Sequence, residues 1–224
     1  MDTVMNPQTN SNLYDNSKRT REKPVYDFIK RLFDIIFSLV AIVLLSPLIL
    51  ILCIAVKATS EGPVIFAHKR VGKGGKTISV YKFRSMVVNA EELIKQFTPE
   101  QKAEFKKNFK LDNDPRITKI GNFLRKTSLD ELPQLFNILK GDISLIGPRP
   151  VTEKETQLYG NYRDMFLSVR PGLTGYWAAS GRSSTSYKRR MAMEIYYVKN
   201  RSFVLDIKIF FKTIISVFKG EGAK

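Results

Sequence analysis

The chain has 224 residues and a net charge of +16, from 37 Lys and Arg against 21 Asp and Glu. This excess predicts an anionic partner, which is nucleic acid, anionic lipid or a phosphorylated substrate. The single cysteine, Cys53, excludes disulfides and a thiolate zinc site, and the single histidine, His68, excludes a Ser-His-Asp triad. Any chemistry must therefore use carboxylates, lysines and arginines.

The N-terminal quarter predicts a tail and a membrane segment. Residues 1–23 are polar and rich in Asn, Ser and Thr, which predicts disorder. Within the membrane segment, residues 24–57, the stretch 35–56 carries no charge and is long enough to cross a bilayer. Ser46-Pro47 lies near its midpoint, and basic residues flank both ends, so the one-sided charge bias of a simple span is absent. We predict a re-entrant helix that bends at Ser46-Pro47, with a straight span as the alternative.

The remainder, residues 58–224, is predicted to be one membrane-associated domain of the α+β class, mostly helical. A small β-hairpin is expected from two β-prone runs, 63–71 and 77–83, joined by a glycine-rich turn. Charged residues 90–110 predict two helices separated at Pro99. Further on, an amphipathic helix is expected around 128–140. The stretches GDISLIGPRP and RPGLTGYWAASGR are expected to be turn-rich connectors.

The last predicted element is an amphipathic helix from Phe203 to Phe218. One face carries only large apolar side chains, and lysines line its edge: Phe203, Ile207, Phe210, Phe211, Ile214 and Phe218, with Lys208, Lys212 and Lys219. Such a face suits a helix packed on the core, and it also suits a helix lying in the lipid interface. Because an anchor lies upstream, we favour the interfacial interpretation.

The sharpest acidic pair is Asp130-Glu131. Ser128 and Glu131 match a capping box, which would make the pair a helix start and nothing more. Arg125 lies just upstream, however, and a helix N-terminus favours bound anions. A carboxylate in that setting can attack phosphorus, or hold Mg²⁺ against substrate phosphates. Both interpretations can hold together, and Asp130 is the candidate for either chemistry.

Several cations are candidates for binding phosphate. Strand alternation places Lys82 and Arg84 on one face, where they would suit a diphosphate, with a solvated face as the alternative. Arg149 lies between two prolines that stiffen its backbone, so its planar fork is presented at low entropic cost; a rigid turn without a ligand is the alternative. Arg170 and Arg182 also lie beside rigid or flexible backbone. The turn that begins at Gly72 fails the phosphate-loop pattern, because an arginine occupies the position of its first glycine.

Taken together, these motifs resemble one family. KRLFDIIFSLVAIVLLSPLIL, YKFRSM, DPRITKIGNFLRKTSLDELPQLFNILKGDISLIGPRP and RPGLTGYWAASGR are similar to the bacterial sugar transferases, the monotopic phosphoglycosyl transferases. The ending YYVKNRSF…GEGAK resembles those that act as undecaprenyl-phosphate galactose or glucose phosphotransferases. The resemblance implies transfer of a sugar 1-phosphate from a UDP-sugar to undecaprenyl phosphate, with release of UMP, as the first membrane step of exopolysaccharide or capsule synthesis.

The resemblance also implies roles for individual residues. Asp130 matches the nucleophile, which would form a covalent phosphosugar intermediate with help from Mg²⁺, and Glu131 completes the dyad. Arg149 matches a position associated with the nucleotide. The remaining matches are basic positions around the phosphates and the helix break of the membrane segment: Lys82, Arg125, and Ser46-Pro47. Ala178-Ala179 departs from the Gln-Val of many relatives, so sugar contacts near Trp177 are left open.

The expected location is the cytoplasmic face of a bacterial plasma membrane, with anchoring by one apolar segment and by surface helices. The expected partners are a UDP-sugar, undecaprenyl phosphate and anionic membrane lipid. No nucleic acid is expected, because the apolar segment would have no purpose there. The sequence leaves open which sugar is transferred and whether the protein is a homodimer. The alternative function is that of a noncatalytic basic adaptor that binds anionic lipid.

Overall fold

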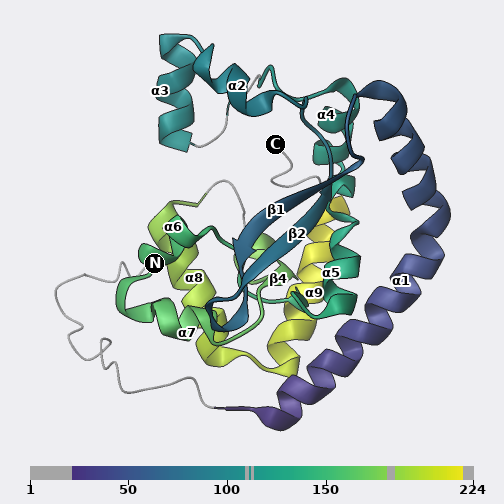
Figure 1. Ribbon diagram of the computed structural model, residues 1–224. Coiled ribbons are helices and arrows are strands. Elements are labelled where there is room, and N and C mark those ends of the chain that lie inside the picture. Colours follow the sequence, from purple (N-terminus) through teal and green to yellow (C-terminus); the bar gives the residue numbers. More distant parts are fainter. Residues whose placement is uncertain (1–21, 109–110, 112–113, 181–184, 219–224) are drawn as a thin grey trace.

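The computed structural model describes residues 22–108, 111, 114–180 and 185–218. Nearly all of the predicted polar tail lies outside these residues. The described chain is mostly helical, with two small two-stranded sheets, as expected of the predicted α+β class. Figure 1 shows one long helix that bows around a domain built on the sheets.

The long helix, α1, runs from Pro24 to Thr59 and begins with proline, whose fixed φ suits a first helical turn. Among the described residues it is the one helix long and apolar enough to cross a membrane. Pro47 lies inside it, and the Ser46 hydroxyl donates to the carbonyl of Val43 at 2.8 Å. The predicted break therefore appears as a proline within a continuous, curved helix (Figure 1).

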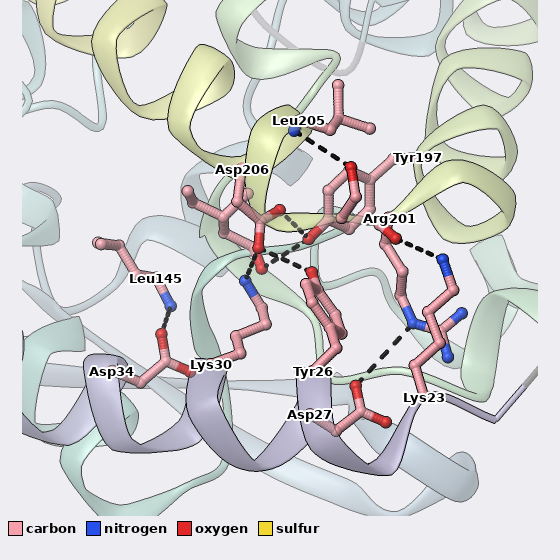
Figure 2. A network of polar contacts seen from close by, with 12 residues as sticks. Lys23, Tyr26, Asp27, Lys30, Asp34, Leu145, Tyr197, Arg201, Leu205 and Asp206 are labelled. Atoms are coloured by element: carbon pink, nitrogen blue, oxygen red, sulfur yellow. Dashed lines mark hydrogen bonds and ion pairs between the residues drawn. The ribbon is translucent and has the colours of Figure 1, made fainter.

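Both ends of α1 pack on the same domain, and its middle contacts the core with one face and exposes apolar side chains on the other. Near the start, Tyr26 and Lys30 donate hydrogen bonds to Asp206, as Figure 2 shows. Near the end, Leu52 and Val56 are buried in a cluster with domain residues. No residue of α1 between Ser38 and Leu52 is buried. A helix whose two ends pack on one domain and whose outer face is apolar has the shape expected of a re-entrant membrane helix.

The predicted hairpin is confirmed. Strands β1 (Ile65–Val71) and β2 (Thr77–Phe83) pair antiparallel, from Ile65 opposite Phe83 to Val71 opposite Thr77. A short 3-10 turn, η2 (Lys73–Gly75), joins them, and both of its glycines have positive φ. The glycine-rich sequence forms this turn because glycine adopts such angles without steric cost.

Behind the hairpin lies α5 (Gln134–Lys140), preceded by the 3-10 turn η3 (Leu129–Glu131). Asn137 of α5 is fully buried, and its side chain forms hydrogen bonds with the backbone of β2, as a neighbouring strand would. Its side-chain oxygen accepts the N–H of Tyr81 at 2.8 Å, and its amide donates to the carbonyl of Ser79 at 2.7 Å. The amphipathic helix expected around 128–140 is confirmed over Gln134–Lys140, whereas Leu129–Glu131 form the separate turn η3.

The second sheet was not predicted. Strands β3 (Ser144–Ile146) and β4 (Gly172–Thr174) are parallel and lie within the two expected connectors. Between them come α6 (Glu153–Gln157), the 3-10 turn η4 (Gly160–Tyr162) and α7 (Arg163–Leu167). Gly147 allows the first connector to approach the second, because a Cβ there would lie 2.6 Å from the carbonyl of Arg170.

The remaining helices cover the domain. The two helices expected within 90–110 are confirmed as α2 (Ala90–Lys95) and α3 (Pro99–Asn108), which project at the upper left of Figure 1, away from α4 (Lys119–Lys126) at the upper right. After the 3-10 turn η5 (Ala178–Ser180) come α8 (Tyr187–Asn200) and α9 (Phe203–Phe218).

The last helix both packs and exposes apolar surface. Ile209 of α9 is buried in the main core, and Phe210 packs against it. Other apolar side chains of α9 are exposed: Phe203, Val204, Ile207, Phe211, Ile214 and Ile215. The side chain of Phe218 and residue Lys219 lie outside what the structure describes. The exposed face is that expected of a helix in a lipid interface, and the opposite face contacts the core.

Candidate active site

The site centres on Asp130, which is held in η3 and is only 7 % exposed. Ser128, the residue before η3, has φ 58°, and its side chain makes no capping hydrogen bond. The predicted capping box is therefore wrong here; the chain forms one instead at Thr152 and Glu155, at the start of α6. A left-handed serine costs about 1–2 kcal/mol, and such strain is concentrated at functional sites.

Lys82 from β2 reaches both acidic side chains. Its Nζ lies 2.7 Å from Oε1 of Glu131 and 3.4 Å from Oδ2 of Asp130. Because Asn137 fixes the backbone of Tyr81, the neighbouring lysine is held at a defined point along η3. The structure thus brings together three residues that the sequence singled out.

Arg125, the last-turn arginine of α4, joins this group. Its Nε donates to the Ser85 hydroxyl at 2.8 Å, which fixes the guanidinium. The positive charge of Arg125 favours the ionised form of Asp130, and burial lowers the pKa of the arginine itself. The predicted basic position near the phosphates therefore lies within electrostatic range of the acidic pair.

These surroundings act on Asp130 in opposite directions. Burial raises the pKa of Asp130, and the neighbouring charge of Glu131 raises it further, whereas Lys82 and Arg125 lower it. The net shift is upward, because desolvation of the carboxylate is the largest cause. Asp130 is thus a poorly solvated carboxylate, which is the state in which an oxygen nucleophile is most reactive toward an electrophile.

The acidic pair also fits a magnesium ion. Mg²⁺ is held in proteins by one or two carboxylates together with substrate phosphates. Asp130 and Glu131 supply two adjacent carboxylates, and added positive charge would offset the repulsion between them. Among the described residues there is no cluster of three or more metal-binding side chains, so the remaining ligands would have to be phosphate and water.

Arg84 has other contacts than Lys82. It follows Phe83, the last residue of β2, and its N–H donates to the carbonyl of Val64 at 2.8 Å. Its guanidinium donates to the carbonyl of Pro63 and to the carbonyl and hydroxyl of Ser60, at 2.6 and 2.8 Å for the last two. Arg84 therefore ties the end of β2 to the end of α1.

A second basic group lies along the same face of the hairpin. Lys82 is paired with Phe66, and alternation along β1 places His68 and Arg70 on that face too. Sequence reasoning missed both residues, although the spacing His68-x-Arg70 carries the signal. Burial lowers the pKa of His68 to about 4, with Arg70, Lys82 and Arg149 adding to the effect. The imidazole is therefore neutral. The cations around it extend from Lys82, beside Asp130, to Arg149 in the Pro-Arg-Pro turn.

Arg149 of that turn stacks on an aromatic ring. Its guanidinium lies 5.5 Å from the Trp177 ring, and that of Arg190 lies 5.1 Å from it. Glu194, which is 1 % exposed, accepts a hydrogen bond from the backbone of Arg149. Burial raises the pKa of Glu194 to about 7, while Arg190 and Arg149 act in the opposite direction. Arg190 and Glu194 were also missed, because a charged pair on a helix gives no sign of burial.

The remaining predicted residues lie elsewhere. The Nε of Arg170 donates to the carbonyl of Gly141, just past the C-terminal end of α5, whereas Asp130 precedes that helix. Arg182 lies outside the described residues. Ser46-Pro47 lies in the exposed middle of α1. The structure therefore brings Lys82, Arg125, Asp130 and Glu131 together, with Arg149 in the adjoining basic group.

A buried carboxylate surrounded by cations, on a domain that carries an apolar helix, is typical of membrane proteins that handle phosphorylated compounds. The chain belongs to the bacterial sugar transferase family, whose model matches residues 25–220. It is 48% identical over 199 residues to the undecaprenyl-phosphate galactose phosphotransferase of Salmonella typhimurium, covering 88% of this chain and 42% of that protein.

Two other relatives show the range of similarity. The exopolysaccharide production protein ExoY of Rhizobium meliloti is 43% identical over 204 residues, which are 90% of either chain. The UDP-glucose:undecaprenyl-phosphate glucose-1-phosphate transferase of Escherichia coli is 36% identical over 217 residues, or 89% of this chain and 44% of that protein. The chain thus spans less than half the length of the Salmonella and Escherichia relatives.

Proposed function

We propose that this protein transfers a sugar 1-phosphate from a UDP-sugar, UDP-galactose or UDP-glucose, to undecaprenyl phosphate and releases UMP. The observation that carries the proposal is the buried Asp130 carboxylate with Glu131 beside it and Lys82 in contact with both. Family membership and the printed names of the relatives support it. Relatives named for exopolysaccharide production support a role in exopolysaccharide or capsule synthesis.

The reaction proceeds in two displacements. In the first, an oxygen of Asp130 attacks the phosphorus that bears the sugar, and the bond from that phosphorus to the oxygen of the other phosphate breaks, so that UMP leaves. In the second, a phosphate oxygen of undecaprenyl phosphate attacks the same phosphorus. The bond to Asp130 breaks, which restores the carboxylate and yields the lipid-linked diphosphate sugar.

The chain's own residues supply charge and position for these steps. Lys82 and Arg125 neutralise the transferring phosphate near Asp130. Arg149, stacked on Trp177, binds the nucleotide, whose phosphates fit its planar fork. Asp130, with Glu131 beside it, would hold Mg²⁺ together with donor phosphates. When bound, the ion offsets the negative charge of the diphosphate.

We infer further that α1 is re-entrant and that the domain lies on the cytoplasmic face of the membrane. The contacts of both ends of α1 with one domain support this topology, because a straight span would carry one end to the far side. Cytosolic UDP-sugar and membrane-bound undecaprenyl phosphate can then meet at one phosphate site. The exposed apolar side chains of α9 support contact of the domain with the lipid surface.

The test uses full-length protein in nanodiscs, with UDP-Gal, UDP-Glc, UDP-GlcNAc and UDP-GalNAc as donors and UMP as the measured product. Asp130→Asn should lower UMP release at least about a thousandfold, because it removes the nucleophile. A donor labelled in the sugar, given without acceptor, should label the wild-type protein but not Asp130→Asn.

Asp164→Asn is the matched control, because the Asp164 side chain on α7 is 99% exposed. It should keep both UMP release and labelling. Normal UMP release by Asp130→Asn would show that another group is the nucleophile. Liposome binding without turnover of any of the four donors would replace the enzyme by a lipid-binding adaptor.

A further inference from the structure

A pocket distinct from the Asp130 site lies between the start of α1 and the domain. Its walls come from α1, the η2 turn, β3, the loop before β4 and the end of α8, and the cavity between them is small, with a volume of about 40 Å³. Five of the lining residues are cations and two are carboxylates, so the walls are basic: Lys30, Arg31, Lys73, Arg170 and Arg201 against Asp27 and Asp34.

Two of the cations already have carboxylate partners. Lys30 lies 2.7 Å from Asp206, and Arg201 lies 4.0 Å from Asp27, as Figure 2 shows. The same network fixes the first turns of α1 against α8 and α9, because the Tyr26 hydroxyl also donates to Asp206. These contacts fix one wall of the pocket, and they pair two of its five cations. The other three cations are Arg31, Lys73 and Arg170.

Arg31 and Arg170 meet at the C-terminal end of α5. Arg31 donates to the carbonyls of Ile138 and Leu139 at 2.6 and 2.8 Å, and the Nε of Arg170 donates to that of Gly141 at 3.0 Å. The two guanidinium charges are close enough to repel each other. Neither forms an ion pair among the described residues, and the terminal nitrogens of Arg170 have no hydrogen-bond acceptor there.

Lys73 brings a third unpaired cation from the turn of the hairpin. It is exposed, and in the described part of the chain its ammonium group has neither an ion pair nor a hydrogen bond. Asp34 is the carboxylate left in the pocket to balance Arg31, Arg170 and Lys73, and one of its oxygens accepts the N–H of Leu145 at 2.9 Å. Counted by formal side-chain charge, these four residues thus leave the pocket an excess of about two positive charges beside the carbonyls at the end of α5.

The pocket lies where the apolar part of α1 begins. Residues 35–56 carry no charge, whereas Lys30, Arg31 and Asp34 lie within the five residues before them. Exposed apolar side chains flank the same turns, with Phe28 72 % and Phe33 52 % exposed. A basic pocket at this level of a membrane helix meets lipid phosphates, and such pockets bind anionic headgroups.

We propose that this pocket binds a phosphate group, that of an anionic phospholipid headgroup, with Arg170 and Lys73 as the principal donors and Arg31 beside them. The site is separate from Asp130 and does not depend on the proposed reaction. It gives a role to the arginine before Pro171 and to the lysine of the hairpin turn. An anion there would relieve the repulsion between Arg31 and Arg170 and lock α1, the hairpin turn and the domain together.

The test titrates full-length protein in uncharged detergent with dihexanoyl-phosphatidylglycerol and follows the midpoint of thermal unfolding, which rises when a ligand binds the folded state. Separate titrations use dihexanoyl-phosphatidylcholine and inorganic phosphate. Phosphatidylglycerol should raise the midpoint of the wild type more than either at equal concentration. In Lys73→Gln/Arg170→Gln its apparent Kd should rise at least about tenfold, because two charged hydrogen bonds are lost.

Matched controls separate the pocket from general surface charge. Lys76→Gln changes the same turn, and Arg189→Gln removes an exposed arginine of α8; neither residue lines the pocket. Lys73→Gln alone is not expected to disturb folding, because it breaks no protein contact among the described residues. It should also weaken the rise of the unfolding midpoint with phosphatidylglycerol.

Two results would overturn the proposal. If Lys73→Gln and the double variant respond to phosphatidylglycerol as the controls do, the pocket is not the site. If inorganic phosphate shifts the midpoint as strongly as phosphatidylglycerol, the pocket takes free phosphate and the headgroup assignment is wrong.

Discussion

Lys82 and Asp130 lie 48 positions apart in the sequence, yet Nζ of the lysine is 3.4 Å from Oδ2 of the aspartate. The lysine favours the ionised form of Asp130 against the effect of burial. Removing it should therefore raise the pKa of Asp130 further, so that less of the carboxylate is ionised at a given pH. In Lys82→Met the acid limb of the rate–pH profile should move to higher pH, and kcat at neutral pH should fall at least about tenfold.

The control for this prediction is Lys69→Met. Lys69 is exposed on β1, where alternation places it on the opposite face of the hairpin from Lys82. UMP release measured across pH for both variants separates local from general charge effects. An acid limb that stays in place in Lys82→Met would show that the lysine does not control Asp130.

The backbone before Asp130 gives a second prediction. Ser128 has φ 58°, which glycine adopts without strain and a β-branched residue adopts poorly. Ser128→Gly should keep stability within about 1 kcal/mol, whereas Ser128→Val should lose about 1–2 kcal/mol or more. Valine should also lower kcat by displacing η3. Thermal unfolding together with UMP release checks both, and unaltered unfolding and rate in the valine variant would contradict the assigned conformation.

The sequence predicted those elements whose signal is local. The turn at Gly72 ends β1 and starts β2, because glycines there fix the turn, and Pro99 begins α3 as a proline can. By contrast, β3 and β4 have three residues each and contain or adjoin glycine and proline. They exist because tertiary contacts hold them, such as the N–H of Gly147 donating to the carbonyl of Thr174. No propensity over so few residues could have shown them.

The same limit applies to the site. The sequence identified four residues of the site because each lies in a recognisable motif or on an expected element: Asp130, Glu131, Lys82 and Arg125. The capping box predicted at Ser128 is wrong because one φ angle decides whether it forms. Charge alone does not tell an arginine that binds substrate from one that closes a helix end, as Arg84 does at Ser60.

The attachment of α1 gives a third prediction. Asp206 is 8 % exposed and accepts hydrogen bonds from Tyr26, Lys30 and Tyr197. Asp206→Asn removes the charge that Lys30 faces and should cost about 3–5 kcal/mol, the loss typical of a broken buried ion pair. Asp27→Asn is the matched control, because its side chain is 43% exposed and it lies 4.0 Å from Arg201. It should cost less than about 1 kcal/mol. Equal unfolding midpoints in detergent would contradict this account of the anchor.

Glu194 gives a prediction for pH. In the folded protein, burial raises the pKa of Glu194 from its ordinary value of 4.5 to about 7. The charges of Arg149 and Arg190 lower the pKa but do not cancel the effect of burial, and Tyr159 also lies nearby. For a carboxyl group shifted upward, the unfolded state releases its proton first. Stability therefore falls as pH rises from about 4.5 to about 7 and then levels off.

Glu194→Gln removes this dependence. The difference in unfolding free energy between wild type and variant should change by roughly 3 kcal/mol across that window, because one pKa unit corresponds to about 1.4 kcal/mol. Glu153→Gln, at an exposed position on α6, serves as the control. Denaturant unfolding at several pH values gives the curves, and parallel curves for wild type and Glu194→Gln would show that Glu194 is ionised throughout.

The topology of α1 gives the last prediction, because its two ends pack on one domain. In a Cys53→Ser background, Glu22→Cys places a thiol just before α1 and Lys188→Cys places one on α8, both at exposed positions. If α1 is re-entrant, an impermeant thiol reagent added to intact cells should label neither, and both should react after the membrane is opened. Labelling of Glu22→Cys alone in intact cells would establish a straight span. That result would also require the contacts of Asp206 with Tyr26 and Lys30 to be broken in the membrane, since they cannot form across a bilayer.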